Sequence, residues 1–287
     1  MPGIAALLTV HNRCHLTLNC LDALFTQELP DGFILETYLV DDGSTDGTSD
    51  EVRGRFPQVR LIRGDGSLYW GGGMRRAWQE ASQRHYDYYL WLNDDTKLLP
   101  GAILTLLATA AELCRRHGCE PLVAGSTHDE RTGMLTYGGK WMRTGVLIEP
   151  HDQPMRCDAI NGNIALIPHS VFAAAGNISP EFTHALGDHD YSLRASAMGI
   201  PVYIAPGYLG VCNPTSPSLW TSREVPFRKR WQVLHTPKGL PPKEYSEFLR
   251  RHVPRKRLWN LLKLYTRVAL PSIWHGKQSG NAVRILD

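Results

Sequence analysis

The chain has 287 residues, 43% hydrophobic and 21% charged, and this ordinary globular composition excludes a mostly disordered or fibrous protein. Its six cysteines show no CxxC pair or metal-ligand spacing, so we expect reduced thiols in a cytosolic protein. The net charge of +3 hides an acidic body, residues 1–222 with 16 Lys or Arg against 24 Asp or Glu, and a basic tail, residues 223–267 with 13 against three.

Strands and helices are predicted to alternate through the first 125 residues. Strands are predicted at 4–10, 34–40, 59–62, 88–92 and 122–125, and helices at 16–24, 48–55, 74–84 and 100–117. This order predicts an α/β fold with a mostly parallel central sheet flanked by helices. Beyond residue 125 we expect a hairpin in 137–148, a kinked strand over 157–167, a short helix over 168–175 and a helix from Gly187 that ends at Gly199.

Two segments are excluded as membrane or targeting elements. The uncharged stretch 195–222 is long enough to cross a bilayer, but its prolines and glycines would break a spanning helix. The amino-terminus lacks a basic start and a small-residue cleavage site, so we expect no signal peptide.

Adjacent carboxylates follow the predicted strand 88–92 in Asn93-Asp94-Asp95. Because ligands of such sheets bind at the carboxyl ends of the strands, this position favours a binding role. Mg²⁺ and Mn²⁺ take one or two carboxylates together with substrate phosphates. The sequence therefore allows a divalent-cation site beside a nucleoside diphosphate, or only a turn before Pro100.

A second acidic pair and a glycine-rich segment follow two other predicted strands. Asp41-Asp42 lies among turn-forming residues, so it either shapes a turn or accepts hydrogen bonds from a base or ribose. Residues 64–73 precede a helix, where the backbone can approach a phosphate and Arg75 adds positive charge. The alternative is that these glycines serve packing only.

The segment Gly187-Asp188-His189-Asp190 places two carboxylates at a predicted helix start. Asp190 is explained by capping of the exposed N–H groups. Asp188 stands earlier and is a candidate general base for an alcohol, with His189 as a second candidate.

In this order the motifs resemble those of the inverting family 2 glycosyltransferases of the GT-A fold, near their rhamnosyltransferase-like members. The resemblance covers roughly residues 3–215 and rests on the segments 9–13, 40–47, 68–74, 91–96, 161–162 and 187–195. It implies a GT-A domain over 1–222. It also implies transfer of a sugar from a nucleoside-diphosphate donor, such as dTDP-rhamnose or a UDP-hexose, to a hydroxyl of a glycan or lipid-linked acceptor in bacterial surface polysaccharide assembly.

The resemblance also implies roles for single residues. Asp188 would be the catalytic base, and Asp95 would hold a divalent cation, Mg²⁺ or Mn²⁺, while Asn161 and Gly162 would line the acceptor side. The other matching positions would bind the nucleotide sugar: His11, Asn12, Arg13, Asp41, Asp42, Tyr69, Trp70, Gly71, Gly72, Gly73, Arg75 and Asp94.

Two other functions stay open. A sugar-phosphate nucleotidyltransferase shares the sheet and an acidic metal site, but it would carry a glycine-rich loop where this chain has His11-Asn12-Arg13. A catalytically degenerate sugar-binding scaffold is the second alternative, because Asn93, Gly187 and Cys212 depart from the family's pattern. We do not expect Cys212 to be a ligand, since a soft thiol suits Mg²⁺ and Mn²⁺ poorly.

The basic extension, residues 223–287, interleaves cations with Trp, Leu and other large apolar residues. Helices of this kind lie on anionic membrane surfaces, which predicts a cytoplasmic protein bound peripherally at the inner face of the cell membrane. The alternative is a helical pair packed on the domain with a solvated basic face. We expect no nucleic-acid partner, because the body is acidic and no nucleic-acid motif is present.

Overall fold

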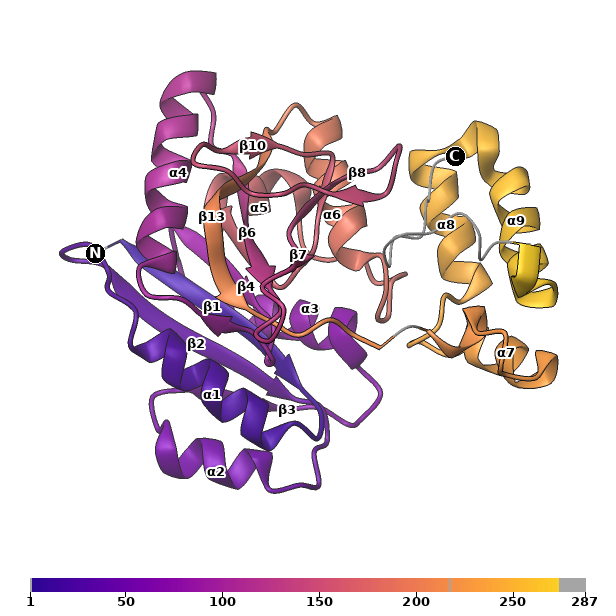
Figure 1. Ribbon diagram of the computed structural model, residues 1–287. Helices are drawn as coiled ribbons and strands as arrows, with labels where there is room; N and C mark the ends of the chain where they lie inside the picture. The colour runs from indigo at the N-terminus through magenta and orange to yellow at the C-terminus, as the bar shows by residue number, and fades with distance from the viewer. Residues whose placement is uncertain (1, 217, 274–287) are drawn as a thin grey trace.

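The computed structural model describes residues 2–216 and 218–273 (Figure 1). The strands of the central sheet are β1 (Gly3–Val10), β2 (Ile34–Asp41), β3 (Arg60–Arg63), β4 (Tyr88–Leu92), β5 (Lys97–Leu98), β6 (Leu122–His128), β7 (Leu135–Tyr137), β10 (Met155–Arg156), β12 (Ile164–Pro168) and β13 (Val202–Val211). A small second sheet holds β8 (Gly139–Trp141), β9 (Val146–Leu147) and β11 (Ala159–Ile160).

The helices follow the strands in chain order. They are α1 (Cys14–Phe25), α2 (Thr48–Arg55), α3 (Tyr69–Ala81), α4 (Ala102–His117), α5 (His169–Ala175), α6 (Gly187–Ala197), α7 (Phe227–Leu234), α8 (Pro242–His252) and α9 (Arg257–Ala269), with short 3-10 turns at Leu219–Thr221, Pro254–Lys256 and Pro271–Ile273.

The first half of the sheet is parallel, as the alternation of strands and helices predicts. The strand order of the whole sheet is β10-β13-β6-β12-β4-β1-β2-β3. Strands β4, β1, β2 and β3 are parallel to one another. Beyond β4 the sheet is mixed, because β12 runs antiparallel to both β4 and β6. The chain enters β12 from the small sheet rather than through a crossover helix, and such a connection allows the antiparallel direction.

The strand alternation divides the core between the two faces of the sheet. Along β1, Ile4, Ala6 and Leu8 pack with α1, α2 and α4, whereas Ala5 and Leu7 face α3, α5 and α6. All eight residues of β1 are buried, which explains why its sequence is a continuous apolar run rather than an alternating one.

Several elements differ from the sequence prediction. The kinked strand expected over 157–167 is divided into β11 and β12, which belong to different sheets. Helix α3 begins at Tyr69 rather than Met74, so the glycines expected in a loop lie in its first turns. Strand β13 was not predicted, because Pro206 and Gly207 interrupt its sequence. Its pairing with β6 is irregular between Ile204 and Tyr208, and such a bulge accommodates proline.

The described part of the C-terminal extension folds as α7, α8 and α9 and packs against the body near α6 (Figure 1). Phe182 and Leu186 of the body share a buried cluster with Phe248 and Leu249 of α8. The predicted division at residue 222 therefore separates segments that share a core, and residues 274–287 of the predicted extension lie outside the described residues. Among the described residues, every helix is too short or too polar to span a bilayer.

Candidate active site at the carboxyl edge of the sheet

Loops from separate parts of the chain meet at one edge of the central sheet. The parallel strands β1, β2 and β4 all end there. The antiparallel strand β12 begins there, with the Asn93 amide donating to the Asn163 carbonyl at 3.0 Å. The predicted acidic and glycine-rich segments consequently lie around one site.

The acidic pair after β4 is paired with Arg13. Its guanidinium Nη1 lies 2.7 Å from Asp95 Oδ2 and 3.3 Å from Asp94 Oδ1. Asp94 is almost fully buried, and burial raises the pKa of its carboxyl group to about 7, with Asp95 adding to the rise and Arg13 opposing it. The second oxygen of Asp94, Oδ2, is buried without a hydrogen-bond partner.

These carboxylates fit a divalent cation that also takes phosphate oxygens. The unpartnered Asp94 Oδ2 and the partly exposed Asp95 are hard oxygen ligands. Within the described ranges, no set of three His, Cys, Asp or Glu side chains is grouped as a complete metal site. Cys212 Sγ lies 3.6 Å from Asp95 Oδ1, but burial and Asp95 raise the pKa of its thiol to about 12, so it is a neutral neighbour and a poor ligand.

Asp42 organises the glycine-rich loop. Its Oδ1 accepts a hydrogen bond from the Gly66 amide at 2.8 Å, and its Oδ2 accepts from the Leu68 and Tyr69 amides at 3.0 and 2.9 Å. The carboxylate therefore caps the start of α3, using the N–H groups that a helix leaves unpaired. These bonds use most of the acceptor capacity of the Asp42 carboxylate. The sequence prediction of a direct contact to a base or ribose did not include them.

Gly71 and Gly73, which are predicted to approach the nucleotide sugar, face protein atoms instead. A Cβ on Gly73 would collide with the Thr9 hydroxyl, and a Cβ on Gly71 would collide with the Phe182 carbonyl oxygen. The Gly71 amide also donates to the Thr183 carbonyl at 2.8 Å. At both positions the structure supports the packing role of glycine. Gly72 also lies in the first turns of α3 and is buried.

Trp70 connects the acidic pair to the candidate base. Its indole N–H donates to Asn93 Oδ1 at 2.8 Å. Its ring lies so close to Gly162 that a Cβ there would collide with it, and Gly187 also contacts the ring. Gly187 directly precedes Asp188, and the Gly162 amide donates to the Asp188 carboxylate, so the segments around Asp95 and Asp188 border the same site.

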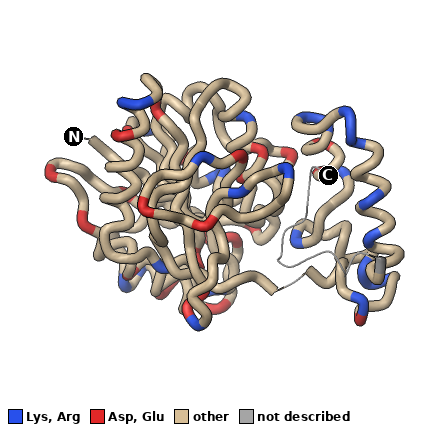
Figure 2. Tube along the Cα trace, turned by 45° about the horizontal axis from the view of Figure 1, so that its top comes forward, with Lys and Arg blue, Asp and Glu red and all other residues tan. Residues whose placement is uncertain are grey.

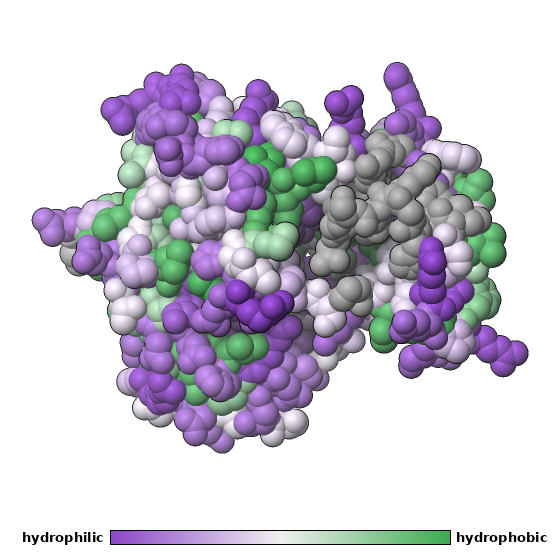
Figure 3. Space-filling model, in the orientation of Figure 1, coloured by the Kyte–Doolittle hydropathy of each residue, from purple (hydrophilic) through white to green (hydrophobic). Residues whose placement is uncertain are grey.

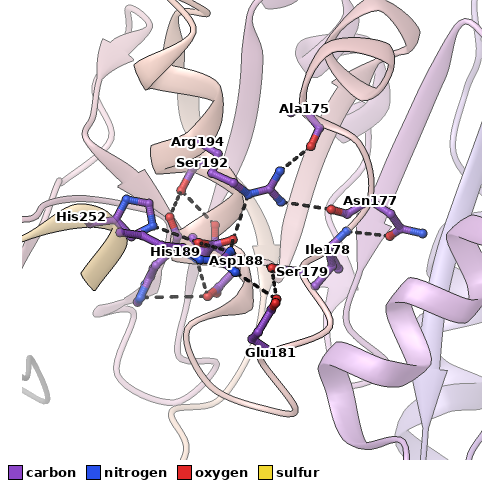
Figure 4. Close-up of polar contacts among 12 residues, drawn as sticks. Ala175, Asn177, Ile178, Ser179, Glu181, Asp188, His189, Ser192, Arg194 and His252 are labelled. Carbon is purple, nitrogen blue, oxygen red and sulfur yellow. Dashed lines mark hydrogen bonds and ion pairs between the residues drawn. The ribbon is translucent and has the colours of Figure 1, made fainter. Parts of the chain in front are cut away.

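Asp188 lies at the start of α6, beside His189 (Figure 4), and its carboxylate accepts hydrogen bonds from backbone donors. The Gly162 amide donates to Oδ2 at 3.0 Å, and the His189 amide donates to Oδ1 at 2.8 Å. The side chain keeps 18% of its surface exposed. An anchored, accessible carboxylate of this kind can accept a proton from a hydroxyl.

His189 is a poor candidate for a general base. The side chain is buried, and both ring nitrogens lack a hydrogen-bond partner. Burial lowers the pKa of its imidazole to about 4, Lys140 lowers it further, and Asp188 opposes this. The ring is therefore neutral at pH 7 and shielded from a substrate.

The remaining predicted residues hold loops together around the site. The ring of His11 lies 2.6 Å from the Asp42 carbonyl through Nδ1, and Asn12 Oδ1 accepts from the Thr45 amide at 2.7 Å. Asp41 accepts from the Ser44 amide at 2.8 Å and from the Ser49 hydroxyl.

Asn161 and Arg75 contact two further segments of the chain. The Asn161 amide donates to the Gly138 carbonyl of the small-sheet segment at 2.8 Å. Arg75 Nη1 lies 3.5 Å from the Ser179 carbonyl, and burial lowers the pKa of its guanidinium. Arg75 thus contacts the segment that leads to α6.

Backbone strain is concentrated at these loops. In the described part of the chain, the non-glycine residues with positive φ are Asn12, Tyr69 and Leu186, at 53°, 53° and 69°. They stand directly after β1, at the start of α3 and directly before Gly187-Asp188. Strained residues of this kind gather where the surrounding structure fixes a functional geometry.

Some residues near the site were not predicted. The ring of His184 lies 6.2 Å from that of Tyr69, and its buried Nδ1 has no hydrogen-bond partner. Asn163 Nδ2 lies 3.4 Å from Cys212 Sγ. Neither belongs to a recognisable motif, and only the tertiary fold brings them here.

Residues 6–131 match the family model described as Glycosyl transferase family 2. The chain carries a family 2 glycosyltransferase domain. It is 26% identical over 194 residues to N-acetylglucosaminyl-diphospho-decaprenol L-rhamnosyltransferase from two Mycobacterium tuberculosis strains. That match covers 58% of this chain and spans 62% of the length of these relatives.

Solved structures show that this glycosyltransferase domain has the GT-A fold. A mannosyltransferase from Pyrobaculum calidifontis, in complex with GDP-Man and Mn²⁺, matches with a TM-score of 0.54 and 16% identity, over 93% of this chain and 70% of that one. TarS 1–349 of S. aureus, in complex with UDP-GlcNAc, matches with a TM-score of 0.56 and 14% identity, over 93% of this chain and 72% of that one.

Proposed function

We propose that the protein is an inverting glycosyltransferase that moves a sugar from a nucleoside-diphosphate donor to a hydroxyl of a lipid-linked glycan acceptor. One observation carries the proposal. Trp70 is hydrogen-bonded to Asn93 of the acidic loop and packs against Gly162 and Gly187, which both lie next to Asp188. This contact supports the proposal, because a single displacement requires a diphosphate site and a proton acceptor beside each other.

Asp188 is proposed as the base that takes the acceptor proton. Its carboxylate accepts two backbone hydrogen bonds at the start of α6 and keeps part of its surface exposed, so it is held where a hydroxyl can reach it. Asn161 and Gly162 are proposed to line the acceptor side, since Gly162 contacts the base directly. Attack by the hydroxyl from the face opposite the leaving group would invert the anomeric configuration.

Asp95 is proposed to hold a divalent cation, Mg²⁺ or Mn²⁺. Asp94, which the sequence predicts to contact the nucleotide sugar, is proposed as a second ligand through its unpartnered Oδ2. Such an ion supplies positive charge for a departing nucleoside diphosphate. Arg13 neutralises the same carboxylates in this structure, so it would have to share or release them when the ion binds. Donor contacts are proposed for the loops after β1 and β2 and for the first turns of α3, at His11, Asn12, Asp41, Asp42, Tyr69, Trp70, Gly71, Gly72, Gly73 and Arg75.

The rhamnosyltransferase relatives suggest a specific donor and acceptor. By analogy with the substrate in their name, we propose an N-acetylglucosaminyl-diphospho-lipid as acceptor and an activated L-rhamnose as donor. dTDP-rhamnose is the first donor to test and UDP-hexoses are the second.

A transfer assay tests the function. Purified protein is incubated with dTDP-rhamnose or a UDP-hexose, a synthetic polyprenyl-diphospho-N-acetylglucosamine and Mn²⁺. We expect a disaccharide lipid, and we expect EDTA to abolish its formation and added Mn²⁺ to restore it. Nucleotide-sugar synthesis from a sugar phosphate and a nucleoside triphosphate would instead indicate a nucleotidyltransferase, and binding without turnover would indicate a scaffold.

The C-terminal helices are proposed to rest on the cytoplasmic membrane surface. Large apolar side chains are exposed on α7 and α9, among them Leu258 at 81%, Trp259 at 56% and Leu262 at 54%. The rings of Trp231 and Tyr265 stack at 5.6 Å, which joins the two helices into one face. Lys and Arg gather on the same helices (Figure 2), and hydrophobic side chains lie at the edge that these helices form (Figure 3). An apolar face bordered by cations fits an anionic bilayer, where a lipid-linked acceptor resides.

A further inference from the structure

The end of α8 is bound to the segment that carries the candidate base. Arg251 Nη1 donates to Ser179 Oγ at 2.7 Å and lies 3.3 Å from Asp190 Oδ1, while its Nη2 lies 3.0 Å from Glu181 Oε2. His252 Nε2 lies 2.9 Å from the same Asp190 oxygen. A single turn of the C-terminal extension thus contacts both the loop before α6 and α6 itself.

Asp190 is the buried centre of this junction. Its side chain has no exposed surface and also pairs with Arg194 Nε at 2.9 Å. Arg194 continues the connection to the carbonyls of Ala175 and Asn177 (Figure 4). Because a buried carboxylate is costly when a partner is removed, the position of Asp190 depends on the cations around it.

The geometry couples this junction to Asp188. Asp190 stands two residues after Asp188 in the first turn of α6, and a rigid helical turn transmits a displacement of one to the other. The loop between Ser179 and Leu186 is also held by Phe182, which packs against Phe248 of α8 with ring centroids 6.2 Å apart. Leu186, at the end of this loop, has the strained φ of 69° that directs the chain into Gly187-Asp188.

We infer that Arg251 is a positioning residue for the transfer reaction, holding Asp190 and the first turn of α6 so that the Asp188 carboxylate points at the acceptor. The expected effect on kcat rests on the proposed function. It makes the C-terminal extension a part of the active-site scaffold in addition to a membrane contact.

The neighbouring residue provides a matched control. Arg250 lies on the same helix and pairs with Glu247 at 2.7 Å, and its side chain is 57% exposed. Arg251→Gln and Arg250→Gln remove the same charge from adjacent positions, but only the first removes contacts to Ser179, Glu181 and Asp190. Arg251→Lys keeps the charge and loses the planar fork that contacts all three.

The experiment measures kcat, the KM for the donor and the KM for the acceptor with the full chain. Misplacement of a catalytic group by about 1 Å costs up to about 100-fold in rate, so we expect Arg251→Gln to lower kcat at least about tenfold. We expect the donor KM to stay within about twofold, Arg251→Lys to be intermediate, and Arg250→Gln to match the wild type.

Amide hydrogen exchange over residues 183–190 gives a readout that needs no activity. We expect faster exchange there in Arg251→Gln and no change in Arg250→Gln. If the wild type transfers no sugar, the proposed function fails, while the exchange comparison still tests the coupling. Equal kcat and equal exchange in the two Gln variants would overturn the inference. If Arg251→Gln does not fold, a wild-type kcat and wild-type exchange in Arg251→Lys would overturn it as well.

Discussion

Arg13 sets the charge of the acidic pair at the end of β4. Its guanidinium approaches both Asp94 and Asp95, and these two carboxylates raise the pKa of Arg13 against the opposing effect of burial. A cation that binds the same oxygens must compete with it.

We therefore expect Arg13→Gln to bind Mn²⁺ more tightly than the wild type. The partly exposed ion pair between Arg13 and Asp95 is worth on the order of 1 kcal/mol. The dissociation constant for Mn²⁺ should therefore fall about fivefold when this pair is removed. Electron paramagnetic resonance of free Mn²⁺, titrated without substrate, measures this. Arg53→Gln, which removes an exposed ion pair on α2, serves as the control. An unchanged affinity in Arg13→Gln would show that the guanidinium does not compete with the ion.

His189 makes stability depend on pH. In the folded protein its pKa is lowered to about 4 from the usual 6.5, chiefly by burial. Between pH 4 and pH 6.5, His189 therefore binds a proton in the unfolded chain but not in the folded protein. The free energy of unfolding therefore falls by about 3 kcal/mol as the pH is lowered from 6.5 toward 4, and above pH 6.5 His189 adds no pH dependence.

We expect His189→Leu to flatten this part of the pH profile. The variant should be at least as stable as the wild type at pH 8, because two unpartnered ring nitrogens are removed. Its free energy of unfolding should then fall less steeply between pH 6.5 and 4. Urea titrations at several pH values measure this, with the exposed His15→Gln as control. A wild-type slope in His189→Leu would contradict the assignment.

For single residues, the sequence predicts the chemistry of a side chain better than it predicts the partners of that side chain. Asp94, Asp95 and Asp188 were singled out as carboxylates at element ends, and the fold brings all three to one edge. The sequence does not show that Asp42 caps α3 or that Arg13 pairs with the acids. These hydrogen bonds join residues 24 to 82 positions apart, and no local pattern encodes such separations.

Helix α3 can lie close to β1 only because it begins with glycines. The space that a side chain at Gly73 would need is filled by Thr9. Gly54, in α2, has nothing within 4 Å of its ideal Cβ position.

We expect Gly73→Ala to destabilise the protein by about 1–3 kcal/mol, because the added methyl group displaces α3 from the strand. Gly54→Ala should be neutral or stabilising by up to about 1 kcal/mol, since alanine favours the helix. Thermal and urea unfolding measure both variants. Equal stability of the two variants would mean that α3 adapts without cost.

Among the elements, the sequence predicts those whose hydrophobic pattern is regular. Strand β4 and helix α2 have the predicted bounds, because each apolar or charged run is bounded by turn residues. The start of α3 was placed too late, since glycine ordinarily disfavours a helix interior and here is selected by tertiary contact. Strand β13 was not predicted, because its proline and glycine signal a turn unless the bulge is known.

For the whole molecule, the membrane proposal depends on the exposed face of α9. Burial of a Trp and a Leu side chain contributes about 1.5–3 kcal/mol each, so Trp259→Ser with Leu262→Ser should weaken vesicle binding well over tenfold. Flotation with vesicles containing anionic phosphatidylglycerol measures this. Binding should also weaken at high salt and on vesicles without anionic lipid.

Met134→Ser provides the control, since this residue is 70% exposed on the body and far from α9 in sequence. It should float like the wild type. Flotation of the double variant at the wild-type level would refute the membrane face.

The proposed reaction of the whole molecule depends on Asp188, which takes the proton of the acceptor hydroxyl during sugar transfer. The most direct test compares Asp188→Asn with the wild type in the transfer assay, together with the affinity of each for the donor nucleotide. Asparagine keeps the size of the side chain but cannot accept the proton, so we expect kcat to fall about 100-fold or more with nucleotide affinity and thermal stability retained. A kcat near that of the wild type would remove Asp188 from this role and contradict the account.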